Sequence, residues 1–101
     1  MSELPGELVL FITGDAPRSR RARGNLARAL GDLGLDAADV REIDLVEHPE
    51  RTVEYGIFAT PALLRRRHDR HHPAVLYGDL SDTEGLARFL EGLSDGARPV
   101  A

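Results

Sequence analysis

The sequence predicts one α/β domain with a mixed sheet and the element order β-α-β-α-β-β-α. Three observations lead to this prediction. Residues 7–13 form an almost continuous apolar run, which is typical of a strand buried on both faces. Apolar residues between Ala22 and Leu33 recur at helical spacing and form one apolar stripe. A third apolar segment begins at Thr60-Pro61, and a proline within a sheet favours the first residue of a strand.

The first half of the chain predicts a βαβ unit. Gly14 and Asp15 end the first strand, and Pro17 suits the first turn of the helix that follows. Gly34 is well placed to end that helix. A second strand is expected at residues 40–46, and we place it at an edge of the sheet because neither of its faces is purely apolar. In a right-handed βαβ unit these two strands lie parallel.

The second half predicts a short helix, a hairpin and a last helix. Pro49 can open the short helix, whose inner face would carry Val53 and Ile57. The hairpin joins the Thr60-Pro61 segment to an apolar strand at residues 74–77.

A helix at residues 81–93 is expected to complete the fold. Ser81 and Glu84 form a capping box at its start. Its buried stripe would consist of Leu86, Phe89, Leu90 and Leu93. The folded domain therefore spans residues 7–93, between tails at residues 1–6 and 94–101.

Composition narrows the function classes. The chain of 101 residues contains no cysteine, which excludes disulfides, zinc–thiolate sites and thiol redox chemistry. The net charge of −4 disfavours a nucleic-acid partner, although all 13 basic residues are arginines. No run approaches the ~20 apolar residues of a membrane helix. The first residues do not resemble a secretory signal, so we expect a cytoplasmic protein.

Candidate catalytic groups are few. Ser19 stands in the first turn of the first helix, but no base is placed by sequence to activate it as a nucleophile. The acidic residues Asp44, Glu47, Glu50 and Glu54 surround the start of the short helix, where negative charge is favourable, so a structural role outweighs acid–base catalysis. We therefore expect no enzyme activity and no cofactor.

A basic stretch precedes Pro73. It contains Arg65, Arg66, Arg67, His68, Asp69, Arg70, His71 and His72. The arginines could form a patch that meets phosphates or an acidic partner, or they could keep an exposed hairpin soluble, and the sequence favours neither. A metal site at the histidines is less favoured, because such a site needs three or four converging groups.

The Thr60-Pro61 dipeptide is the candidate binding position. If its peptide bond is cis, the backbone of Thr60 can receive an extended segment of a partner by strand addition. Ile57 and Phe58 nearby are either core residues or part of a partner surface, and their burial decides between these alternatives.

Four blocks of the sequence resemble the KaiB family. They are Leu-Phe-Ile-Thr-Gly-Asp-Ala-Pro-Arg-Ser at residues 10–19, Ile-Asp-Leu-Val-Glu-His-Pro at 43–49, Ala-Thr-Pro-Ala-Leu at 59–63 and Gly-Asp-Leu-Ser at 78–81. The resemblance implies a thioredoxin-like fold, in which Ala16 to Ser19 occupy the place of the redox cysteines. It also allows an alternative ground-state topology with a rearranged C-terminal half.

The resemblance also implies a function. KaiB-like proteins bind the ring-shaped ATPase KaiC, related domains serve as sensors of histidine kinases, and KaiB forms dimers and tetramers. A KaiC-like ATPase is therefore the expected partner, a histidine kinase a possible one, and a homo-oligomer a possible state. The expected partner-binding residues are Glu47, Tyr55, Ile57, Phe58, Thr60, Pro61, Gly78 and Asp79.

One segment departs from the family pattern. Clock members carry a run of prolines before the Gly-Asp-Leu-Ser block, whereas this chain has only Pro73. Since X-Pro isomerisation is slow, fewer prolines make slow fold switching less expected. We therefore expect the thioredoxin-like form. Two alternative functions remain, an interaction module of a histidine-kinase system and a phosphate or nucleic-acid binder that uses the arginine–histidine hairpin.

Overall fold

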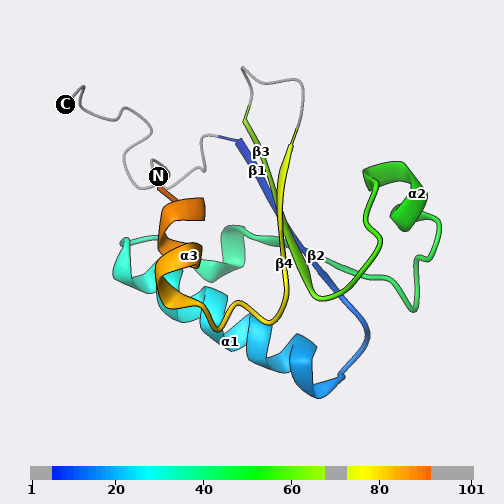
Figure 1. Cartoon of the computed structure of the whole chain (residues 1–101), viewed down its shortest axis with the longest axis horizontal. Helices are drawn as coiled ribbons and strands as arrows, with labels where there is room; N and C mark the ends of the chain where they lie inside the picture. The colour runs from blue at the N-terminus through cyan, green and yellow to red at the C-terminus, as the bar shows by residue number, and fades with distance from the viewer. Residues whose placement is uncertain (1–5, 68–72, 92–101) are drawn as a thin grey trace.

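A four-stranded mixed sheet forms the centre of the molecule (Figure 1), and the computed structural model describes residues 6–67 and 73–91. The strands lie in the order β2 (Arg41–Asp44), β1 (Gly6–Ile12), β3 (Ala62–Arg67) and β4 (Ala74–Tyr77). β1 pairs with β2 in parallel, whereas the other two pairs are antiparallel. The mixed sheet and the edge position of the second strand are confirmed.

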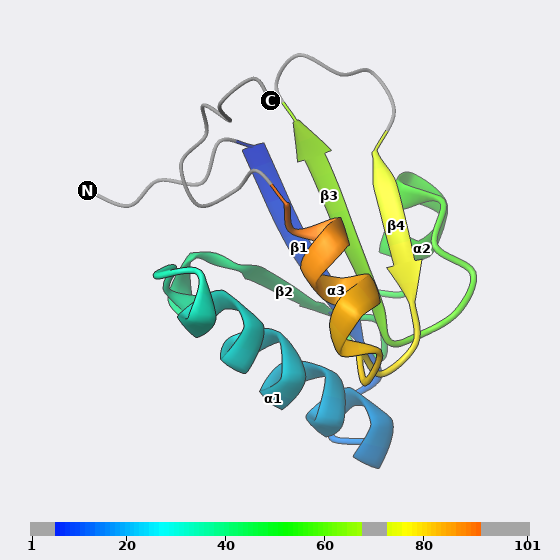
Figure 2. The same ribbon diagram turned by 60° about the vertical axis from the view of Figure 1, so that its left-hand side comes forward.

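Helices cover the two faces unequally. The helices are α1 (Pro17–Asp32), α2 (Arg51–Tyr55) and α3 (Thr83–Phe89), and a short 3-10 turn at Ala37–Asp39 precedes β2. Figure 2 shows α1 and α3 on one face of the sheet and α2 beyond the other. The element order is the predicted β-α-β-α-β-β-α, in the thioredoxin-like arrangement rather than the rearranged alternative.

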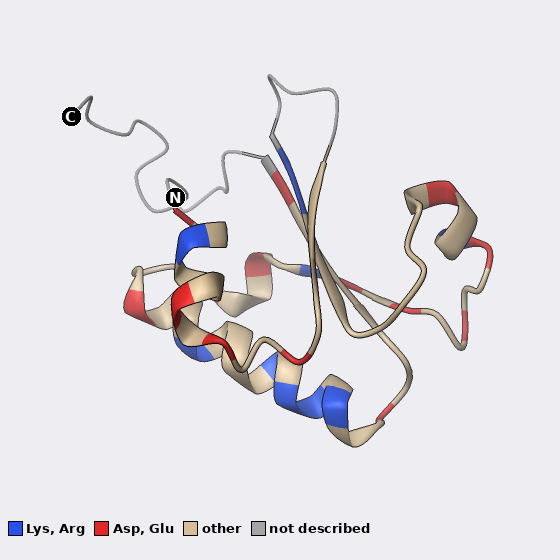
Figure 3. Ribbon diagram, in the orientation of Figure 1, with Lys and Arg blue, Asp and Glu red and all other residues tan. Residues whose placement is uncertain are grey.

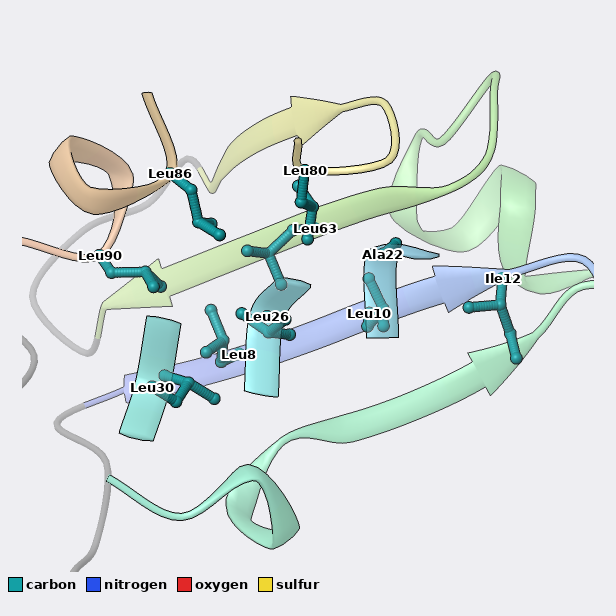
Figure 4. Packing of buried hydrophobic residues seen from close by; sticks show 10 residues of the cluster. All are labelled: Leu8, Leu10, Ile12, Ala22, Leu26, Leu30, Leu63, Leu80, Leu86 and Leu90. Atoms are coloured by element: carbon teal, nitrogen blue, oxygen red, sulfur yellow. The ribbon is translucent and has the colours of Figure 1, made fainter. Parts of the chain in front are cut away.

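The larger core lies between the sheet and the helices α1 and α3 (Figure 4). Its buried members are Leu8, Leu10, Ile12, Ala22, Leu26, Leu30, Leu63, Leu80, Leu86 and Leu90. Strand residues two apart enter this core because a strand turns alternate side chains to the same face. Each fully buried leucine contributes about 1.5–3 kcal/mol to folding, so this layer holds both helices on the sheet.

A smaller core lies on the opposite face. It consists of Val9, Phe11, Ile43, Ile57, Ala62 and Leu64. Tyr55, at the end of α2, packs its ring edgewise on Phe11, with ring centroids 5.2 Å apart. β1 therefore contributes apolar side chains to both cores, as its continuous apolar run predicts.

Helix α1 ends as the sequence predicts. Gly34 adopts a left-handed conformation with φ of 75°. The amide of Leu35 donates to the Leu30 carbonyl at 2.8 Å, and the Gly34 amide donates to Gly31 at 3.0 Å. This pair of bonds is a Schellman cap, which satisfies the last carbonyls of a helix.

Two predicted elements differ from the structure. The second strand ends at Asp44 rather than at residue 46, because the Asp44 carboxylate accepts hydrogen bonds from the amides of Gly14 and Val46, both at 2.9 Å, and so forms a turn. The expected capping box is also wrong. Asp82, not Ser81, caps α3, and its carboxylate accepts from the Gly85 amide at 3.1 Å. The predicted stripe residue Leu93 lies outside the described residues.

The predicted inner face of the short helix is also wrong. Val53 is 87% exposed, whereas Ile57 is 3% exposed. Ile57 follows the helix, and Gly56 turns the chain with φ of 70° to carry it into the smaller core. Within α2, Tyr55 packs on Phe11 of the sheet. Ile57 enters the smaller core because of the turn at Gly56, and not because of its helical spacing from Val53.

Candidate functional site

Side-chain hydroxyl groups form hydrogen bonds at the N-terminal end of α1. Ser19 is 1% exposed, and its Oγ accepts a hydrogen bond from the Thr13 amide at 3.0 Å. The hydroxyls of Thr13 and Thr60 are hydrogen-bonded to each other, and the Thr60–Pro61 peptide bond is cis. Ser19 therefore ties the end of β1 to the first turn of α1, an arrangement that supports a structural role for its hydroxyl.

Burial separates the two apolar residues beside this tip. Ile57 belongs to the smaller core and is unavailable to a partner, and Pro61 is also fully buried. Phe58, in contrast, is 83% exposed. Its ring stacks on that of Tyr77 in β4, with centroids 4.5 Å apart and planes inclined by 33°. The expectation that burial would distinguish core from surface is met, and Phe58 is the surface residue.

Two further exposed apolar residues were missed by sequence reasoning. Val46, in the turn after β2, is 64% exposed, and Val53 of α2 is 87% exposed. Together with Phe58 and the exposed Glu47, Glu50 and Glu54 they define what we call the α2 surface. In Figure 1 α2 and its flanking loops lie on the side of the sheet away from α1 and α3. No local signal identifies these valines, because an apolar residue in a predicted strand, as Val46, or in a predicted helix, as Val53, is usually taken as core.

Charge is distributed unevenly over the fold. Figure 3 shows arginines along α1 and acidic residues along β2 and the segment that leads into α2. Arg51 partly balances the acidic side, with Nη1 2.8 Å from Glu54 and Nε 3.9 Å from Glu50. The α2 surface thus combines exposed apolar side chains with more acidic than basic groups. Protein-binding surfaces typically carry both apolar and polar side chains.

Asp44 positions the start of this surface. Hydrogen bonds from the Gly14 and Val46 amides lower the pKa of the Asp44 carboxyl, and the nearby Arg23 and His48 act in the same direction. The carboxylate thereby joins the turn after β1 to the turn after β2, and it orients Val46.

The turn at Gly78 and Asp79 is tied to α1. Asp79 accepts a hydrogen bond from the Ser81 amide and one from Arg21 Nε, both at 3.1 Å, while Asn25 Nδ2 donates to the Asp79 carbonyl at 2.9 Å. Bonds from Ser81 and Arg21 lower the pKa of the Asp79 carboxyl. These contacts fix the end of β4, and with it Tyr77, relative to α1.

The remaining predicted binding residues lie in different surroundings. Glu47 is exposed, whereas Tyr55, Thr60, Gly78 and Asp79 are half-buried. Of the predicted binding residues, Glu47 and Phe58 therefore belong to the α2 surface, and Tyr77, which was not predicted, packs against the ring of Phe58.

The structure does not bring the described arginines of the basic stretch together. Arg65 lies on the α3 side of the sheet, where its Nη1 donates to the Phe89 carbonyl at 2.7 Å. Arg66 lies on the opposite side, 5.9 Å above the Tyr55 ring and 3.7 Å from Glu7. Adjacent residues of a strand face opposite ways. A single patch containing both side chains is therefore wrong. The side chain of Arg67 and the predicted patch residue Arg70 lie outside the described residues.

The described part of the chain lacks two kinds of feature. In residues 6–67 and 73–91 no three His, Cys, Asp or Glu side chains converge as metal ligands. His68, Asp69, His71 and His72 of the basic stretch lie outside these ranges. None of the described helices has the length and apolar character needed to cross a bilayer.

Solved structures with a similar fold include the N-terminal domain of SasA and several thioredoxins. The N-terminal domain of SasA from Synechococcus elongatus superposes with a TM-score of 0.69 at 21% identity, covering 100% of this chain and 91% of that domain. Mitochondrial thioredoxin 3 of Saccharomyces cerevisiae gives a TM-score of 0.64 at 15% identity, covering 91% of this chain and 82% of the thioredoxin. These similarities confirm the thioredoxin-like fold.

Sequence comparison identifies the family. The KaiB domain family matches residues 9–91. Circadian clock protein KaiB3 of a Synechocystis species is 36% identical over 90 residues, covering 88% of this chain and 85% of that protein. Circadian clock oscillator protein KaiB of a Synechococcus species is 35% identical over 94 residues, covering 87% and 82%. The four resembling blocks, the fold and these matches agree, and the chain belongs to the KaiB family.

Proposed function

We propose that this chain is a non-catalytic regulatory protein that binds a KaiC-like ATPase ring as part of a clock-related system. Family membership supports the clock context, since the curated relatives are named as circadian clock proteins. The observation that carries the proposal is the exposure of Phe58, an aromatic side chain that is 83% exposed while its ring stacks on Tyr77. A large apolar side chain held in a fixed position on the surface is typical of a binding hot spot.

The α2 surface would supply the contact. Val46, Val53 and Phe58 would provide apolar area, and the exposed Glu47, Glu50 and Glu54 would favour a partner surface that carries both apolar and basic side chains. The domain that carries this surface would span residues 7–93 and act in the cytoplasm.

The mechanism would be conformational preference. A protein that binds one state of an ATPase ring more tightly than another shifts the ring toward the tighter-binding state. A tenfold difference in affinity corresponds to about 1.4 kcal/mol per binding event, and several copies on one ring would add their effects. No bond-making step is needed. The absence of cysteine and the use of the Ser19 hydroxyl inside the fold support a non-catalytic role.

Gel filtration with a KaiC homologue tests the proposal. We expect the chain to co-elute with the ring in the presence of either ATP or ADP, and more strongly with one of them. Val53→Asp should abolish co-elution without unfolding the chain, because Val53 is almost fully exposed. Ala27→Asp is the matched control, since Ala27 is exposed on α1 and lies outside the α2 surface. Failure of the unmodified chain to co-elute with either nucleotide would refute the proposal.

A further inference from the structure

A cavity between α1 and α3 lies apart from the α2 surface. Its volume is about 120 Å³, and it is lined mainly by apolar side chains of the two helices and of the turn before α3. Leu80, Leu86 and Leu90 line it and are 5%, 2% and 0% exposed. Ala29 on α1 and Ala87 on α3 also line it. Because both alanines are small, the helices leave a space here that larger side chains would fill.

The mouth of the cavity carries one positive and one negative side chain. Arg28 and Asp32 both line it and stand one turn apart on α1. In the part of the chain that the structure describes, neither has an ion-pair partner within 4 Å. The surface thus offers a cation and an anion, side by side, next to an apolar space.

The positive group is held in place. Asn25 donates from Nδ2 to the Asp79 carbonyl at 2.9 Å, so its side chain is fixed between α1 and the turn before α3. Its Oδ1 accepts a hydrogen bond from Arg28 Nη2 at 2.8 Å. Asn25 therefore orients the guanidinium at the cavity, and an oriented donor loses less conformational freedom on binding an anion.

We propose that this cavity binds an apolar α-amino acid in its zwitterionic form. The ligand carboxylate would pair with Arg28, the ammonium group with Asp32, and the side chain would enter the space among Leu33, Leu80 and Leu86. An apolar cavity of about 150 Å³ can hold benzene, so a branched four-carbon side chain suits the volume found here. The inference does not depend on the proposed binding of an ATPase ring.

The test is a titration of the isotope-labelled full chain with L-leucine, followed in two-dimensional amide NMR spectra. We expect saturable shifts at Ala29, Leu33, Thr83 and Ala87, with a dissociation constant on the order of 1 mM for a ligand of this size. Glycine lacks the side chain and should produce no saturable shifts there. 4-Methylpentanoate and isopentylamine each lack one charge and should bind roughly tenfold more weakly.

Variants of the chain complete the test. Arg28→Gln and Asp32→Asn should each weaken leucine binding roughly tenfold. Ala29→Leu should abolish it by filling the cavity, whereas Ala27→Leu, on the exposed side of the same helix, should leave it unchanged. If Ala29→Leu disturbs the amide spectrum, Ala87→Leu fills the space from the other helix.

Two results would overturn the inference. One is the absence of saturable shifts with leucine at ten times the expected dissociation constant. The other is equal binding of leucine and its singly charged analogues, together with unchanged affinity in the Arg28→Gln and Asp32→Asn variants.

Discussion

The ring of Phe58 stacks on the ring of Tyr77 with a centroid separation of 4.5 Å, although 83% of Phe58 is exposed. The contact joins the loop after α2 to the edge strand β4. Tyr77 is itself fixed, because the turn that follows it is bonded to Arg21 and Asn25 of α1. An exposed aromatic ring on a rigid support loses little freedom when a partner covers it.

Phe58→Ala should therefore weaken binding to a KaiC homologue much more than it weakens the fold. Truncation of a hot-spot aromatic residue costs about 2 kcal/mol or more in binding, or roughly 30-fold in dissociation constant. Loss of the stacked pair should lower the free energy of unfolding by about 0.5–1.5 kcal/mol at most. Surface plasmon resonance and urea unfolding measure the two quantities.

Arg88→Ala is the control for this prediction, because Arg88 is exposed on α3, across the sheet from α2. It should leave the affinity unchanged. Equal affinity of the Phe58→Ala variant and the unmodified chain would show that Phe58 is not part of the binding surface.

Ser19→Ala should destabilise the fold. The substitution removes the Ser19 hydroxyl, which is 1% exposed and accepts the hydrogen bond of the Thr13 amide. A partly buried donor left without its partner costs about 1–3 kcal/mol. Chemical denaturation should show a lower midpoint with an unchanged slope, whereas Arg18→Ala, one residue away and exposed, should stay within about 0.5 kcal/mol of the unmodified chain. A Ser19→Ala variant as stable as the Arg18→Ala control would mean that this bond has no net effect.

Asp44 should contribute to stability in a pH-dependent way. Its pKa is lowered in the folded chain by hydrogen bonds from the Gly14 and Val46 amides, so the folded state binds the proton more weakly than the unfolded state. The stabilisation is fully present above the ordinary aspartate pKa of about 3.9, and it is lost as the pH falls through the lowered value. The stability difference between the unmodified chain and Asp44→Asn should be largest at pH 6 and should shrink toward pH 3.

Urea midpoints at several pH values measure this difference. Glu91→Gln serves as control, because Glu91 is exposed after α3 and has no ion pair within the described residues. If the stability difference between the unmodified chain and the Asp44→Asn variant stays constant from pH 6 to pH 3, the charge of Asp44 is not its cause.

Two glycines, one within α1 and one at its end, should respond in opposite directions to alanine. Gly34 has φ of 75°, and a methyl group added there would meet no atom within 4 Å, so Gly34→Ala should cost about 1–2 kcal/mol from backbone conformation alone. Gly24 lies inside the helix with equally open surroundings, and Gly24→Ala should stabilise by about 0.5–1 kcal/mol. Thermal unfolding of both variants measures the direction of each stability change. A stabilised Gly34→Ala variant would contradict the assigned C-terminal cap of α1.

Most of the fold could be predicted because its signals are local. The apolar run of residues 7–13 became β1, which supplies both cores. The helical stripe that contains Ala22 and Leu26 faces the sheet, and Gly34 ends the helix as expected. These features depend on side-chain period and on the conformational freedom of glycine, and both can be recognised in the sequence itself.

The candidate site could be predicted only in part. Phe58 and Glu47 lie on the exposed α2 surface, but Val46 and Val53 were not anticipated there. Val53 is exposed because the short α2 contacts the sheet through Tyr55, and Val46 is exposed because it lies in the turn after β2. The length of a helix with so few residues depends on its packing more than on its own sequence.

By itself the sequence determined the order of elements, the mixed sheet, the KaiB resemblance and the exclusion of thiol chemistry, because each follows from residue type and spacing. Only the tertiary structure decided which apolar residues are buried around α2, that Arg65 and Arg66 occupy opposite faces, and that Ala29 and Ala87 leave a cavity between two helices. These outcomes depend on contacts between segments far apart in the chain, and the geometry of such contacts is set when the helices pack on the sheet.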